Sequence, residues 1–162
     1  MRPGDHPEFF RLAPPEGASR ESTIRLDADG RFWHDGERVE HPALEAALHR
    51  WIARHPDDGR FILTNGWDWT YFTVDDAPYT VRSLQVEPDR VVLRLSDGTD
   101  EPLDPTTARV GAHDALYVRV KGGAFDARFS RHAQGQLEPV LEAGPGGEPM
   151  LAVGGRRYMV SF

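Results

Sequence analysis

The sequence predicts an α+β protein made mostly of strands, in which two ββαββ-like motifs are joined by a β-rich middle segment. Short stretches of alternating polar and apolar residues recur along the chain, and Gly-containing turns separate them. One segment, 43–54, has the spacing of an amphipathic helix. The same order of hairpin, helix and hairpin is expected again near the end, which predicts a structural repeat with few matching residues.

Residues 1–20 are expected to form an irregular arm. Four prolines and two glycines fall in this stretch and interrupt any regular element. Phe9, Phe10 and Leu12 lie within it, and exposed tails rarely contain several large apolar side chains. We therefore expect these three residues to hold the arm against the body of the protein.

The first motif covers residues 21–76. A strand at 23–26, the turn Asp29-Gly30 and a returning strand at 31–34 predict a hairpin. Pro42 then opens the helix, because proline is tolerated in the first helical turn. Its apolar stripe consists of Leu44, Ala47, Leu48, Trp51 and Ile52. A second hairpin follows around Asn65-Gly66.

Residues 77–162 contain the β-rich middle and a second, more compact motif. Strands are expected at 79–87 and 90–96, followed by a hairpin with Gly122-Gly123 at its turn. A helix is expected within 132–143, shortened by Gly135 and Pro139. A closing hairpin turns at Gly154-Gly155.

Composition limits the classes of partner. The 162 residues carry a formal net charge of -7, which opposes phosphate backbones and anionic lipid surfaces. We therefore expect neither a nucleic-acid nor a membrane partner, and the oligomeric state stays open. With 28% charged and 39% hydrophobic residues the composition is that of a globular protein. No apolar run has the length of a signal peptide core or a membrane span, so a soluble, cytoplasmic protein is expected.

Known catalytic and metal-binding patterns are missing from the sequence. There is no cysteine, and neither G-x-S-x-G, H-E-x-x-H nor a Gly-rich phosphate loop occurs. His41, His49 and His55 bracket one helix, but spacings of eight and six do not bring imidazoles together as i, i+4 would. We expect these histidines to be exposed or capping, and we expect no metal, no cofactor and no catalytic residue.

The best candidate for a site is the basic stretch 109–131. It contains four arginines and the chain's single lysine, against two aspartates, within an acidic protein. Arg119 and Lys121 are expected on one strand face, and Gly122-Gly123 can present backbone amides to an anion. The alternative is a hairpin whose arginines pair with carboxylates and whose glycines only turn the chain. The candidate ligand-binding residues are Arg119, Lys121, Gly122, Gly123, Arg128, Ser130 and Arg131.

Two other features have a functional and a structural interpretation. Asp75-Asp76 can supply carboxylates for acid–base chemistry, but adjacent strand residues point to opposite faces, so a role in the turn before Pro78 is favoured. Trp67, Trp69 and Tyr71 alternate along one strand, which suits either a buried central strand or a stacking platform for flat ligands.

Three segments carry a resemblance to a known family. They read I-R-L-D-A-D-G-R-F-W-H-D-G (24–36), V-D-D-A-P-Y (74–79) and Y-V-R-V-K-G-G-A-F-D-A-R-F-S-R (117–131). In this order they resemble a bacterial family catalogued as domain of unknown function 1285, over about residues 22–160. The resemblance implies a mostly-β α+β fold built of repeated motifs and no established activity, with signal transduction as a suggested role. Residues 1–20 have no match in it.

These observations favour a non-catalytic binding or regulatory protein that recognises a small anionic ligand or an acidic peptide. An alternative is a hydrolase-type enzyme that uses Asp76 or His34. A third is a scaffold or oligomerisation module that acts through exposed sheet edges.

Overall fold

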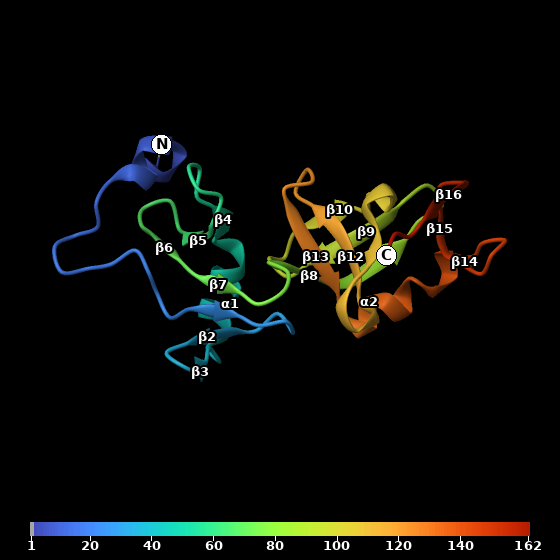
Figure 1. Cartoon of the computed structure of the whole chain (residues 1–162), viewed down its shortest axis with the longest axis horizontal. Helices are drawn as coiled ribbons and strands as arrows, with labels where there is room; N and C mark the ends of the chain where they lie inside the picture. Colours follow the sequence, from blue (N-terminus) through green and yellow to red (C-terminus); the bar gives the residue numbers. More distant parts are fainter. Residues whose placement is uncertain (1) are drawn as a thin grey trace. The chain divides into compact units, whose positions relative to one another are not determined.

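The structure of the chain is a computed structural model that describes residues 2–162 (Figure 1). The chain divides into two compact units, the first ending at Asp76 and the second comprising Ala77–Phe162. Strands predominate over helices in both, as the sequence predicts for a mostly-β α+β protein. None of the helices formed by the described residues is long and apolar enough to cross a membrane.

The first unit contains two short 3-10 helices, one α-helix and two small sheets. The helices are η1 (Pro3–Asp5), η2 (Pro7–Arg11) and α1 (Pro42–Arg50). One sheet has the order β3-β2-β1-β7, with β1 (Arg25–Leu26), β2 (Phe32–His34), β3 (Glu37–Arg38) and β7 (Thr73–Val74). The other has the order β4-β5-β6, with β4 (Ile52–Arg54), β5 (Phe61–Thr64) and β6 (Trp69–Tyr71).

Helix α1 is shorter than the sequence suggests. His41 caps it, since its Nδ1 accepts a hydrogen bond from the Leu44 amide (3.3 Å). The helix ends at Arg50, and Ile52 belongs to β4 and pairs with Leu63. The expectation of a helix to residue 54 was wrong because β4 gains a strand partner there. Leu44, expected to be buried, is 45% exposed, whereas Leu48 is buried.

The core of the first unit lies around Phe32, Ile62, Leu26 and the buried His49. The His49 ring packs edge-on against Phe32 at 4.8 Å between centroids. His55 is also buried, so the expectation that the histidines of this region are exposed or capping holds only for His41. The hydrophobic periodicity of the sequence could not show this burial, because a polar imidazole is counted among the residues expected at the surface.

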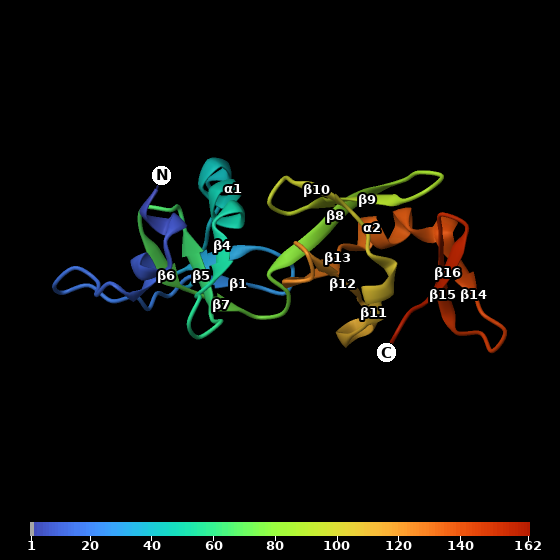
Figure 2. The same cartoon turned by 90° about the horizontal axis from the view of Figure 1, so that it is seen from above.

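The second unit is built on a six-stranded sheet of order β10-β9-β8-β13-β12-β11 (Figures 1 and 2). All its pairs are antiparallel except β8 with β13. The strands are β8 (Tyr79–Val86), β9 (Val91–Leu95), β10 (Asp100–Pro102), β11 (Arg109–Val110), β12 (Leu116–Val120) and β13 (Phe125–Phe129). Between them lie the 3-10 turns η3 (Pro105–Thr107) and η4 (Ala112–Asp114).

The chain ends with a helical segment and a small meander. These elements are α2 (Arg131–Gln136), η5 (Glu138–Val140), β14 (Leu141–Ala143), β15 (Pro149–Val153) and β16 (Arg156–Met159). The predicted helix therefore ends at Gln136, Pro139 lies in the 3-10 turn that follows, and residues 141–143 form a strand. The order hairpin, helix, hairpin does occur in both units, but β1 pairs in parallel with β7 whereas β13 pairs in parallel with β8. The repeat stays a prediction.

Candidate functional site

Three arginines lie on one face of the β11-β12-β13 part of the second unit. In the register of this sheet Tyr117 is opposite both Arg109 and Arg128, and Arg119 is opposite Asp126. Directly opposite residues of an antiparallel pair project from the same face. The other face carries Val118, Val120, Ala127 and Phe129, all buried. We call the face on which Arg109, Arg119, Asp126 and Arg128 surround the buried Tyr117 the arginine face.

Asp126 lies between two of these guanidinium groups. Its Oδ1 is 3.3 Å from Arg119 Nε, and its Oδ2 is 3.5 Å from Arg109 Nη2. The side chains of Arg119 and Arg109 remain 48% and 42% exposed. One carboxylate therefore pairs with two solvent-accessible guanidinium groups. The net charge of these three groups is positive, although the chain as a whole is acidic.

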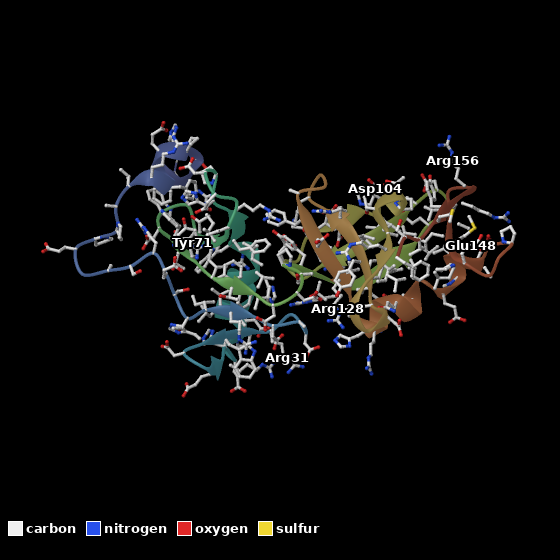
Figure 3. The ribbon with its side chains drawn as sticks, viewed as in Figure 1. Arg31, Tyr71, Asp104, Arg128, Glu148 and Arg156 are labelled. Atoms are coloured by element: carbon white, nitrogen blue, oxygen red, sulfur yellow. The ribbon has the colours of Figure 1, made fainter. Side chains whose placement is uncertain are left out.

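The third arginine extends the same face toward the centre of the sheet. Arg128 pairs in register with Tyr117 on one side and with Thr80 of β8 on the other. Figure 3 labels its side chain on the second unit. The Arg109 guanidinium lies 4.5 Å from the centroid of the Tyr117 ring, a cation–π contact that holds it over the sheet.

A glycine lets the loop after β11 lie directly on this face. A Cβ atom at Gly111 would lie 2.6 Å from the Tyr117 ring, closer than carbon atoms approach. His113 and Asp114 follow with φ of 58° and 59°, a left-handed conformation that non-glycine residues adopt at a cost in energy. The amide of Gly111 donates to the carbonyl of Ala115 (2.9 Å), which closes the loop.

Lys121 does not share the strand face of Arg119. It lies in the turn after β12 with φ of 57°. Its Nζ donates to Asp97 Oδ2 (2.7 Å) and Thr99 Oγ1 (2.8 Å), and its amide donates to the carboxylate of Glu101 (3.1 Å). These bonds join the turn to the β9–β10 hairpin, so the sheet curls and its β10 edge reaches the end of β12.

Two ionisable groups near Lys121, Asp97 and Tyr79, have shifted pKa values. Burial by itself raises the pKa of Asp97, but hydrogen bonds from Lys121 and Thr99 outweigh it and lower that pKa below its usual value. Burial, together with the negative charges of Asp97 and Glu101, raises the pKa of Tyr79 to about 12. With two carboxylates at one lysine, this end of the sheet favours cations over anions.

The remaining predicted residues lie in turns and at a helix start. Gly122 and Gly123 have positive φ, and the Gly123 amide donates to Val120 within the turn (3.2 Å). Ser130 is the N-cap of α2, where its Oγ accepts from the Ala133 amide (3.1 Å) and donates to the Arg82 carbonyl (3.2 Å). Arg131 is the exposed first residue of α2.

The structure thus brings together Arg119 and Arg128 from the predicted set and adds Arg109, Tyr117 and Asp126. The two-residue strand β11 is what places Arg109 beside β12, and a strand this short has no recognisable periodicity. The available signal was the basic bias of 109–131, which contains all three arginines.

The groups considered for catalysis lie in the first unit. His34 ends β2, its side chain is largely exposed, and its Nε2 is 3.5 Å from Asp35 Oδ2. Asp75 accepts a hydrogen bond from Arg25, and Asp76 follows at the exposed end of the unit. Among residues 2–162 no three His, Asp or Glu side chains are grouped so that they could hold a metal ion.

The alternating aromatic residues do not form one platform. Trp67 lies in the turn before β6 and is 64% exposed, whereas Trp69 is buried. Trp69 packs instead against Tyr71 and His55, each at 5.1 Å between ring centroids. Trp67 does not share a strand face with the other two, because it lies in the turn 65–68 and β6 begins only at Trp69.

Comparison with known proteins identifies the fold. No protein-family model matches the chain, and no curated protein matches it. The crystal structure of a DUF1285 family protein from Silicibacter pomeroyi DSS-3 matches with a TM-score of 0.70 and 19% identity, over 94% of this chain and 92% of that one. A DUF1285 family protein from Shewanella baltica OS155 matches with a TM-score of 0.58 and 17% identity, over 75% and 94% respectively. The chain therefore has the fold of the DUF1285 family, the family that its sequence resembles.

Proposed function

We propose that this chain is a non-catalytic binding or regulatory module and that its second unit binds a small anion, or the acidic group of a peptide, at the arginine face. The observation that supports this most is the placement of two half-exposed guanidinium groups on a single carboxylate, Asp126. Arg109 and Arg119 retain donors beyond the bonds they make to it, since each guanidinium has five N–H groups.

Arginine suits this task because its planar fork matches carboxylate and phosphate oxygens and forms short charge-assisted hydrogen bonds. An incoming anion is drawn to the excess charge and competes with Asp126 for the same donors. The net charge of -7 repels anions at long range, so we expect binding that depends on the cluster and weakens with salt.

The proposed partner is a phosphorylated or carboxylated metabolite or an acidic peptide, and neither nucleic acid nor a membrane surface. A role in signal transduction and a cytoplasmic location agree with it and remain part of the proposal. The absence of cysteine in the sequence suits a reducing compartment.

The test compares two arginines of the second unit. Arg119→Ala removes a donor of the arginine face, whereas Arg94→Ala removes an exposed arginine that pairs with Asp100 elsewhere on the same sheet. Thermal unfolding is followed with phosphate, sulfate and a panel of phosphorylated metabolites. A ligand at 100 times its Kd stabilises the native state by about 2.7 kcal/mol, so Tm should rise for the wild type and Arg94→Ala but not for Arg119→Ala.

A third variant separates binding from structural support. Asp126→Asn removes the negative charge that competes with the anion but keeps a side chain of nearly the same size. We expect the anion to bind about tenfold more tightly, which corresponds to a gain of about 1.4 kcal/mol in binding free energy. An Arg119→Ala protein that melts much earlier but keeps its anion response would refute the proposal. So would an unchanged affinity in Asp126→Asn.

A further inference from the structure

The N-terminal residues of the first unit consist of a docked segment and an exposed connection. Residues 2–11 include η1 and η2 and contact the body of the unit. Residues 12–19, with Pro14, Pro15 and Gly17, are almost entirely exposed and form a loop that leaves the strands in both views (Figures 1 and 2). The backbone rejoins the unit at Arg20, whose carbonyl accepts from the Tyr71 amide (2.7 Å).

The docked segment begins with main-chain contacts to one turn. The Gly4 amide donates to the Gly66 carbonyl (2.8 Å), and Arg2 Nη1 donates to the Asn65 carbonyl (3.1 Å). A Cβ at Gly4 would lie 2.8 Å from Gly66 Cα, so the two backbones approach as closely as glycine permits. The turn itself is held by Asn65, whose Oδ1 accepts from the amides of Trp67 (2.8 Å) and Asp68 (2.9 Å).

Phe10 is the apolar anchor of the segment. Its ring centroid is 6.0 Å from those of both His55 and Trp69. Its carbonyl accepts from His55 Nε2 (2.9 Å), while His55 Nδ1 accepts from the Asp57 amide (3.1 Å). This pattern requires the neutral Nε2–H form of His55, so the imidazole is oriented by the body and presents a donor to the segment.

Arg11 adds a matching charge. Its Nε and Nη2 donate to the two carboxylate oxygens of Asp57 at 3.0 and 2.7 Å, a bidentate arrangement. Both side chains remain about half exposed, so this ion pair selects a partner more than it stabilises the fold. An aromatic residue followed by arginine is thus recognised by a fixed donor, an aromatic pocket and a carboxylate.

One buried polar group next to the segment has no partner among residues 2–162. Trp69 is buried beside Phe10, and its Nε1 has no hydrogen-bond partner among the described residues. A buried donor without an acceptor costs free energy that a better-matched occupant would recover. The side chain of Phe10 contains no hydrogen-bond acceptor. A peptide that supplied an acceptor to Trp69 Nε1 would therefore bind this site more tightly than residues 2–11 do.

We propose that residues 2–11 are an exchangeable, tethered occupant of a peptide-docking site formed by His55, Asp57, Asn65, Gly66 and Trp69. The site takes a peptide with a 3-10 turn in which an aromatic residue is followed by arginine. The exposed connection keeps the resident segment at an effective concentration in the millimolar range, so that it acts as an intramolecular competitor. A partner peptide binds when it displaces the segment, which makes the site self-regulated.

The test uses the full chain with a weakened resident segment. In the double variant Phe10→Ala/Arg11→Ala the resident segment has lost its anchor and its charge, and a labelled synthetic peptide of residues 2–12 is added. We expect this variant to bind the peptide at least tenfold more tightly than the wild type, whose own segment competes. Leu12→Ala/Glu16→Ala, two changes in the exposed connection, is the matched control and should behave as the wild type.

Two further measurements make the result decisive. A peptide carrying Phe10→Ala should bind at least tenfold more weakly, and Asp57→Asn in the double variant should weaken the normal peptide. If the double variant does not fold, Arg11→Ala alone is used, since its ion pair is exposed, and a severalfold gain in peptide affinity is expected. A folded variant with no affinity for the peptide, or one that binds the Phe10→Ala peptide equally well, would show that the segment is only a fixed part of the fold.

Discussion

Lys121 shows at the level of one residue how a basic side chain in a promising stretch can have a structural role. Its ammonium group is bound by Asp97 and Thr99, and its amide by Glu101. The side chain of Asp97 is only 9% exposed and that of Lys121 28% exposed. An anion at this turn would meet two carboxylates first, which is why the arginines carry the proposed function.

Removal of this lysine should destabilise the second unit. Lys121→Met leaves a nearly buried carboxylate without its counter-ion, and we expect a loss of about 3 kcal/mol in the free energy of unfolding, measured in urea. Arg94→Gln, which breaks an exposed ion pair with Asp100, is the control and should change stability little. The double variant Asp97→Asn/Lys121→Met should recover part of the loss. Equal effects of Lys121→Met and Arg94→Gln would contradict this account.

Tyr79 predicts how stability changes in alkali. Because burial and the nearby carboxylates raise its pKa to about 12, the folded protein keeps this phenol neutral after the unfolded chain has ionised it near pH 10. The unfolded state then binds fewer protons, so stability falls as pH rises from about 10 to about 12. We expect a contribution of about 2–3 kcal/mol to this fall, which Tyr79→Phe removes. Parallel curves for both proteins would refute it.

At the level of elements, the arginine face depends on register. One face of β12 carries the buried Val118 and Val120, and the other carries Tyr117, which is also buried, and Arg119. Strand β13 places Arg128 opposite Tyr117 and Asp126 opposite Arg119. A shift of one residue in this pairing would turn the arginines inward and the valines outward. The buried valines therefore position the charged side chains, although they have no contact with any ligand.

Helix α1 makes a prediction that separates two leucines four residues apart. Leu48 is buried, whereas Leu44, on the preceding turn, is 45% exposed. We expect Leu48→Ala to lower the free energy of unfolding by roughly 2–5 kcal/mol, the range for truncation of a buried leucine. Leu44→Ala should cost well under half as much in the same urea titration. Similar losses for the two would show that the helix packs along its whole stripe.

At the level of the whole molecule, each unit has its own core and its own candidate site. The first unit is closed by its N-terminal segment around Trp69, and the second by contacts from the β9–β10 hairpin to the β12–β13 turn. Figure 3 marks Tyr71 in the first unit and Arg128 in the second. The proposed anion site and the proposed peptide site use different residues, so variants can test each without changing the other.

We expect the chain to be independent of metal ions. No three potential ligands are grouped among residues 2–162, and the sequence contains no cysteine. We expect a chelator to leave the Tm unchanged and elemental analysis of untagged protein to find no stoichiometric zinc or iron. A stoichiometric metal would show that the histidines have been misinterpreted.

The sequence by itself determined the class of fold, the positions of most hairpins and the family resemblance, because glycine-containing turns and alternating strands are local signals. The pairs Asp29-Gly30, Gly122-Gly123 and Gly154-Gly155 each lie in a turn between two strands, as predicted from their glycines. Only the tertiary structure decided where α1 ends, that His49 and His55 are buried, and that Lys121 binds Asp97. These outcomes depend on partners distant in sequence: Leu63 opposite Ile52, Phe10 on His55, and the β9–β10 hairpin at Lys121. A local pattern contains no information about which of several possible partners a residue meets, and packing and charge pairing settle that choice.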